Sequence, residues 1–163
     1  MRIPSVNRSG WQSSNRKAFT LVELLLVVGI LGVIASVVQG FYGDFVQGTV
    51  LSDNSQSFIF DLRQARNKAM AGAADRNWGI FIVNDTNDYY EIFSSPTDYS
   101  DLEKTIEATN YLRDQAGWIF PVEGDNQEIV FNKISGTASS TEIIIGMKRL
   151  SRTIRINSQG LVE

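Results

Sequence analysis

The sequence predicts an α+β protein in which a long N-terminal α-helix packs on an antiparallel β-sheet domain. Three observations lead to this fold class: an apolar run over residues 19–38, helical periodicity over residues 49–74, and β-forming segments between polar turns from residue 78 onward. One layer of sheet then covers the apolar face of the helix. The predicted division is a leader at 1–18, a transmembrane helix at 19–38, its amphipathic continuation at 39–75 and a β-rich globular domain at 76–163.

The leader is polar and basic and has no periodicity, so we predict that it is disordered. Its four charged residues are all basic, and no acidic residue precedes Glu23. Without residues 1–18 the chain holds 11 basic and 18 acidic residues, a net charge of −7. A basic segment before an apolar helix favours a cytoplasmic N-terminus and a domain on the other side of the membrane. The basic residues of the leader are Arg2, Arg8, Arg16 and Lys17.

The apolar run has the length of a membrane span. Residues 19–38 as one α-helix extend about 30 Å at ~1.5 Å per residue, the thickness of the hydrocarbon core of a bilayer. Glu23 interrupts the run, and an ionisable group inside a membrane costs about 2.5–3.5 kcal/mol on insertion scales. Glu23 therefore either lies near the membrane surface or has a partner.

A secretory signal peptide is the competing interpretation of this segment. Such a peptide has a shorter apolar core without an acid, followed by a cleavage site of small residues. Residues 35–37, Ala-Ser-Val, match that site only weakly. A plain single-pass anchor for an extracytoplasmic domain is a further alternative.

The composition excludes several classes of chemistry. The chain has neither Cys nor His, so it forms no disulfide and lacks thiol nucleophiles, His-based triads and the usual zinc sites. No glycine-rich phosphate loop precedes a helix. We therefore predict a structural protein that is not an enzyme, with no catalytic residue, no cofactor and no metal.

The helix is expected to continue beyond the membrane. Residues 39–48 contain three glycines, which weaken a helix, and aromatic residues suited to a membrane interface. Helical periodicity then returns over residues 49–74, with Asp53 as a capping residue if the helix restarts and Gly72 near its end. The residues predicted to share the buried face are Leu51, Ser55, Phe58, Leu62, Ala65 and Ala69.

The rest of the chain reads as strands. Two β-forming segments around the polar turn 84–88 predict a hairpin. The strands continue to the C-terminus, and we expect one sheet to cover the helix, although the pattern does not establish that the sheet is continuous. The predicted strands are 78–83, 89–94, 105–110, 118–120, 128–134, 141–148 and 151–157.

The sequence Ala18-Phe19-Thr20-Leu21-Val22-Glu23, between a basic leader and an apolar helix, resembles the type IV prepilin signal. The family includes type IV pilins and type II secretion pseudopilins. The resemblance implies cleavage between Ala18 and Phe19 by a prepilin peptidase, followed by N-methylation of Phe19. The family usually has Gly at the position of Ala18, and this departure bears on the efficiency of cleavage.

The resemblance also implies partners and a location. Subunits of this family pack their apolar helices into a filament, and the carboxylate at the position of Glu23 meets the N-terminal amine of a neighbour, which sets the register. Residues 60–73 and the C-terminal strands are similar to those of GspH/FimT-type minor pilins and pseudopilins. The expected partners are the peptidase, other pilin subunits and an inner-membrane platform, with secreted cargo as a further one. The expected location is the inner membrane and then a periplasmic or cell-surface filament.

Two groups of acidic residues are candidates for calcium sites. Carboxylates in loops can bind calcium through oxygen. Neither group has EF-hand spacing and both fall in predicted turns, so we favour solvated turns. The groups are Asp98, Asp101 and Glu103, and Asp85 and Asp88.

Four basic residues near the C-terminus stand out in an acidic domain. Lys148, Arg149, Arg152 and Arg155 are candidates for contacts with DNA phosphates, and some FimT-like minor pilins bind DNA. In a strand, however, Arg152 points away from Arg149 and Arg155, and no aromatic residue lies between them as a stacking platform. We favour a charged strand edge that resists aggregation.

Overall fold

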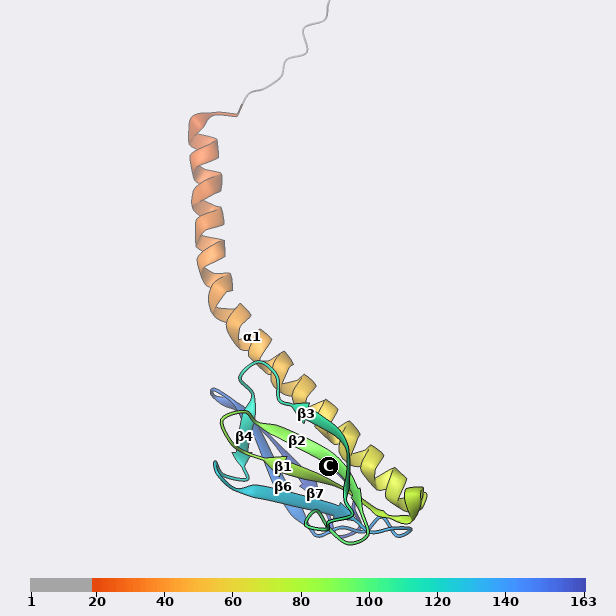
Figure 1. The fold of residues 1–163 in the computed structure, drawn as a ribbon. Coiled ribbons are helices and arrows are strands. Elements are labelled where there is room, and N and C mark those ends of the chain that lie inside the picture. The colour runs from red at the N-terminus through yellow and green to blue at the C-terminus, as the bar shows by residue number, and fades with distance from the viewer. Residues whose placement is uncertain (1–18) are drawn as a thin grey trace, which may run out of the picture. The chain divides into compact units, whose positions relative to one another are not determined.

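The computed structural model describes residues 19–163, except for the side chains of residues 37–41. The chain divides into two compact units, residues 1–41 and residues 42–163. Helix α1 (Leu21–Met70) runs through both units. Figure 1 shows that the second unit contains the C-terminal half of α1 and all the strands. The α+β fold, a helix packed on antiparallel sheets, is confirmed.

Helix α1 has no break in residues 49–74 until it ends. Asp53 lies inside it and is exposed, so it does not cap a second helix. The six residues predicted to share a face are all buried, with Leu51 at 6% exposure and the other five at 0%. The helix ends at Met70, and Gly72 follows with a left-handed φ of 63°. Glycine adopts this conformation at low cost, which explains the end of the helix.

The strands form two antiparallel sheets, which differs from the expected single sheet. The four-stranded sheet has the order β3-β2-β1-β5, and the three-stranded sheet has the order β4-β6-β7. The predicted hairpin is β1–β2, with Val83 opposite Tyr89. The strands are β1 (Asn77–Val83), β2 (Tyr89–Ser95), β3 (Thr105–Tyr111), β4 (Gly117–Phe120), β5 (Asn126–Phe131), β6 (Thr141–Met147) and β7 (Leu150–Ile156).

Strand β5 ends three residues before the predicted boundary at Ile134. Ile134 has a φ of 70°, and its N–H donates to the carbonyl of Ala69 in α1 at 2.9 Å. This contact turns the chain away from the first sheet before β6 begins. A Cβ on Gly136 would meet the Met70 side chain at 2.5 Å, so the loop passes close against the helix end.

One hydrophobic core lies between α1 and both sheets. Phe58 of α1 is fully buried at its centre. Its ring meets Tyr90 of the first sheet at 5.0 Å and Trp118 of the second at 5.1 Å, both edge to face. Such aromatic pairs add about 0.5–1.5 kcal/mol to the burial of their area. Phe58 thus holds the two sheets to the same helix.

The second half of α1 runs antiparallel to the edge strand β3. Residues with increasing numbers in the helix contact residues with decreasing numbers in and after the strand. The contacts are Asn54 with Arg113, Asp61 with Asn110 and Lys68 with Glu107. The last pair is an ion pair between the half-buried Lys68 and the exposed Glu107. These polar contacts place the helix beside the edge of the first sheet (Figure 1).

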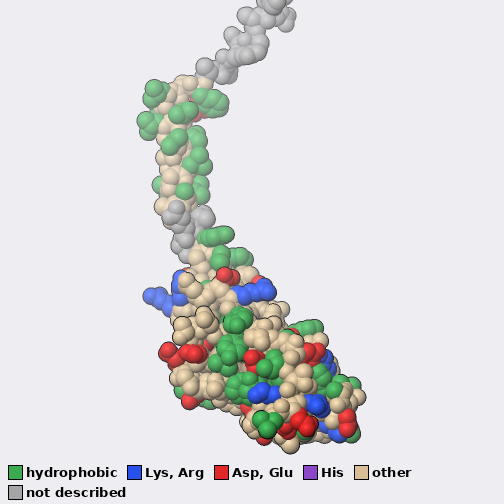
Figure 2. Space-filling model, in the orientation of Figure 1, with side chains coloured by type: hydrophobic (Ala, Val, Ile, Leu, Met, Phe, Trp, Pro, Cys, Tyr) green, Lys and Arg blue, Asp and Glu red, His purple; other side chains and the backbone are tan. Residues whose placement is uncertain are grey.

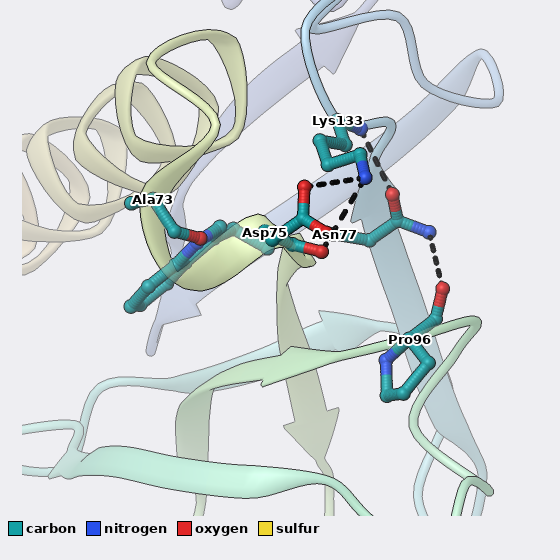
Figure 3. A network of polar contacts seen from close by, with 6 residues as sticks. Ala73, Asp75, Asn77, Pro96 and Lys133 are labelled. Atoms are coloured by element: carbon teal, nitrogen blue, oxygen red, sulfur yellow. Dashed lines mark hydrogen bonds and ion pairs between the residues drawn. The ribbon is translucent and has the colours of Figure 1, made fainter.

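The connection from α1 to β1 is held by a polar network (Figure 3). Asn77 accepts from the N–H of Lys133 at 2.8 Å and donates to the carbonyl of Thr97 at 3.0 Å, which joins two loops. The ammonium of Lys133 pairs with Asp75 at 2.7 Å. This hydrogen bond, with the charge of Lys133, lowers the pKa of Asp75 below its usual value.

Candidate functional site

The start of α1 contains the residues of the predicted processing site. Thr20 caps the helix, because its hydroxyl accepts from the N–H of Glu23 at 3.2 Å. Thr20 and Glu23 have the spacing of a capping box, and an acid in the first turn also complements the helix dipole. Glu23 therefore has a local role in the helix besides the predicted register role. Phe19 is 78% exposed, and Ala18 lies outside the described residues.

The first turns of α1 present apolar side chains on all sides. The large apolar residues between Phe19 and Ile34 are between 46% and 78% exposed (Figure 2). An exposed apolar surface of this extent marks an interaction site with protein or membrane. By length and hydropathy, no helix within the described residues qualifies as a membrane span. The predicted span 19–38 ends at residues 37 and 38, whose side chains lie outside the described ones.

The four basic residues near the C-terminus do not form one surface. Lys148 and Arg149 are exposed in the turn between β6 and β7. Arg152 reaches α1, where its guanidinium lies 3.4 Å from the hydroxyl of Ser52. Arg155 lies opposite Glu142 in the β6–β7 pair and forms an ion pair with it at 3.6 Å. Lys148, Arg149 and Arg152 therefore lie in or next to the turn between β6 and β7, whereas Arg155 is paired with Glu142 further along β7.

The first acidic group is folded into turns. Asp98 accepts from the N–H and hydroxyl of Ser100, at 2.9 Å and 2.6 Å. Asp101 accepts from the N–H of Glu103 and the hydroxyl of Thr97, both at 2.9 Å. These hydrogen bonds lower the pKa of Asp101. The carboxylates already satisfy local donors, as expected for solvated turns.

The second acidic group also serves the fold. Asp88 accepts from the N–H of Trp118 at 3.1 Å, which ties the hairpin turn to β4. Its other oxygen is buried without a hydrogen-bond partner. Desolvation raises the pKa of Asp88 above its usual value, against the opposing effect of the Trp118 N–H. Within residues 19–163, no group of three or more acidic side chains is placed to hold a metal ion.

A groove between α1 and β3 was not anticipated from the sequence. It has a volume of about 820 Å³ and is lined by α1, β3 and the loop after β3. At its base the hydroxyl of Tyr90 donates to Asp61 at 2.6 Å, and the amide of Asn110 donates to the same oxygen at 3.0 Å. Burial and the neighbouring Asp61 carboxylate both raise the pKa of Tyr90.

The sequence contains only a weak signal for this groove. The helical period puts Asp61 on a different face of α1 from the core residues, but its partners Tyr90 and Asn110 lie far along the chain. The exposed ring of Phe60 and the carboxylates of Asp53 and Asp114 also line the groove. Only the pairing of α1 with β3 brings these residues together.

Residues 13–38 match the family model of the prokaryotic N-terminal methylation motif. This segment contains the whole Ala18–Glu23 sequence and the apolar run, so the match supports a prepilin-like N-terminus. It also supports processing by a prepilin peptidase and assembly with other pilin subunits. No solved structure matches the fold.

Proposed function

We propose that this chain is a structural subunit of a type IV pilus or type II secretion filament, a minor pilin or pseudopilin of the GspH/FimT type. The observation that carries the proposal is the methylation motif at residues 13–38, which contains the start of a helix whose second half packs on an antiparallel β domain. A helix with apolar side chains on all sides before a folded domain suits a subunit that is anchored first and assembled later.

In this proposal the chain is inserted once in the inner membrane through residues 19–38. The basic leader stays in the cytoplasm and the β domain lies outside. The peptidase cuts between Ala18 and Phe19, and the new amine of Phe19 is methylated. Extraction into the filament then replaces lipid contacts of the apolar helix by contacts with neighbouring helices.

Glu23 is proposed to set the register between subunits. A buried carboxylate without a partner is costly, and an ammonium group of a neighbour relieves that cost. Because Glu23 also occupies the first turn next to Thr20, a test must preserve the helix start. Glu23→Gln keeps a capping-box residue and removes the charge. We expect it to leave cleavage intact and to abolish filaments.

The first experiment is mass spectrometry of the mature N-terminus from membranes of a host with a matching prepilin peptidase. The expected species begins at methylated Phe19. Ala18→Gly is the matched control that should be cleaved, and Ala18→Leu should not be, because a small residue precedes the cut in this family. An intact chain would leave only an anchored domain, and a start beyond residue 35 would indicate a secreted protein. Either result would refute the filament function.

A DNA-binding minor pilin is the second candidate, since Lys148, Arg149 and Arg152 are exposed in or next to the turn between β6 and β7. Arg155 points elsewhere and is paired with Glu142, which makes the phosphate-binding surface smaller than the sequence suggests. Salt-dependent DNA binding that Arg149→Glu abolishes would favour this candidate.

A further inference from the structure

Most basic residues of the folded unit already have partners. The four ion pairs within residues 19–163 engage Lys68, Arg76, Lys133 and Arg155. Arg63 and Arg66 donate to backbone carbonyls, and Lys104 lies over the ring of Tyr99. Within residues 19–163, the side chains of Arg113, Lys148 and Arg149 form no ion pair or hydrogen bond, and Arg152 has only its contact with Ser52.

Three of these residues form what we call the basic turn: Lys148, Arg149 and Arg152. Lys148 and Arg149 connect β6 to β7. Arg152 is the third residue of β7 and pairs with Ile145 of β6. All three are exposed, as is Leu150 between them. The contact of Arg152 with Ser52 fixes the basic turn beside α1. Figure 2 shows Lys and Arg side chains at the end of the domain from which α1 leaves it.

The groove between α1 and β3 has the opposite charge. Its lining includes three carboxylates, Asp53, Asp61 and Asp114, and one guanidinium, that of Arg113. Asp53 and Asp114 are exposed and form no ion pair within the described residues. The exposed ring of Phe60 adds an apolar surface that suits a side chain such as Leu150.

The basic turn and the groove lie on opposite flanks of α1. A helix rotates by about 100° per residue, so the side chains of Ser52 and Asn54 point about 160° apart around the helix axis. Ser52 touches Arg152 of the basic turn, whereas Asn54 touches the loop at Arg113, which borders the groove. Two residues correspond to a rise of only about 3 Å. The two surfaces therefore lie at the same level along the helix and on either side of the core-facing stripe.

We propose that the basic turn of one subunit docks into the acidic groove of a second copy of this chain. The two surfaces differ and sit on opposite flanks, so the contact is head to tail and leaves one free surface at each end. Such a heterologous contact generates an open helical filament unless the rotation closes a ring. Opposite charge steers the encounter and sets the register, and salt weakens it. The proposal rests on the proposed function, since α1 must hold neighbouring domains at similar levels.

Site-specific crosslinking of the full chain in membranes tests the contact, because the chain has no Cys of its own. Ser57→Cys in the groove and Ser151→Cys beside the basic turn are small changes at exposed positions. With a short bismaleimide we expect a ladder of oligomers from the double variant and monomers from each single variant. As a control, Ser151→Cys with Asn67→Cys places the second thiol about 15 Å further along α1 than Ser57 and should give no ladder.

Charge changes in the double-Cys background identify the pairs that matter. Arg149→Glu or Asp53→Lys should each lower the ladder at least about tenfold, because like charges then face each other. The combination of both changes should restore it. Asp125→Lys makes the same change in charge at an exposed position away from the groove and should have no effect.

Several results would overturn the proposal. Dimers from a single-Cys variant would indicate a symmetric contact. The absence of a ladder in chains that begin at methylated Phe19 would refute the docking and leave the filament function standing. A ladder in chains that are not cleaved would support the docking contact and refute the filament function. Loss of DNA binding by Arg149→Glu without loss of the ladder would assign the basic turn to DNA.

Discussion

The clearest test of the folded unit is the removal of the Asn54 side chain. Asn54 is 8% exposed and bridges α1 to the loop after β3. Its side-chain oxygen accepts from the N–H of Arg113 at 2.9 Å, and its amide donates to the carbonyls of Arg113 at 3.3 Å and Val50 at 2.9 Å. Asn54→Ala deletes both contacts with Arg113 and separates the loop from the helix.

The magnitude follows from these bonds. Each bond contributes about 0.5–1.5 kcal/mol net, and an abandoned buried partner adds a desolvation cost, so we expect a loss of about 2–3 kcal/mol. Alanine is a better helix former than asparagine by roughly 0.6 kcal/mol, which offsets part of the loss. The net change of about 2 kcal/mol corresponds to a fall in Tm of about 8 °C for a unit of this size.

Thermal unfolding of the detergent-solubilised full chain measures this change, and hydrogen exchange at the Arg113 amide localises it. Asn67→Ala is the matched control, because Asn67 is exposed on the same helix and its side chain has no hydrogen bond within the described residues. The control should be neutral or slightly stabilising. If Asn54→Ala behaved like Asn67→Ala, the bridge would not contribute to stability and the reasoning would fail.

Two further predictions concern buried polar contacts of the same unit. Tyr90→Phe removes the hydroxyl that donates to Asp61 and should lower the free energy of unfolding by about 1.5–3 kcal/mol, the range for hydrogen bonds to charged groups. The control is Tyr89→Phe, because the hydroxyl of Tyr89 makes no hydrogen bond within residues 19–163. Urea unfolding measures both variants, and equal losses of stability would contradict a contribution from the Tyr90–Asp61 bond. Desolvation raises the pKa of Asp88 in the folded state above its value in the unfolded state. The folded state is therefore most stable when Asp88 is protonated, below the unfolded-state pKa, and this contribution to stability is lost as the pH rises through the folded-state pKa. Asp88→Asn should therefore raise the Tm at pH 7, with a gain that shrinks towards pH 4, whereas a gain independent of pH would refute a charge effect.

Much of the fold could be predicted from local patterns. The buried stripe of α1 follows from a period of about 3.6 residues, since one apolar face must pack on the sheet. The β1–β2 hairpin follows from two β-forming segments around a polar turn. The N-terminal motif is likewise contiguous, and its match to a family model needs no tertiary structure.

The division into two sheets could not be predicted in this way. It depends on which strands pair, and β6 pairs with β4 and β7 rather than with β5, its neighbour in the chain. The end of β5 was also misplaced, because the N–H of Ile134 bonds to Ala69, sixty-five positions earlier. Local propensity carries no information about such distant partners.

The candidate functional surfaces also fall into two groups, those that the sequence determined and those that depend on the tertiary structure. By itself the sequence determined the processing motif, the apolar helix and the position of Glu23, because these lie in one continuous segment whose chemistry is local. The sequence also indicated that Arg152 points away from Arg155, but only the tertiary structure decided that Arg152 contacts α1 and that Asp53, Asp61 and Asp114 share one groove. Both outcomes depend on the position of α1 between the edge strand β3 and β7, which is set by the packing of Phe58 against both sheets.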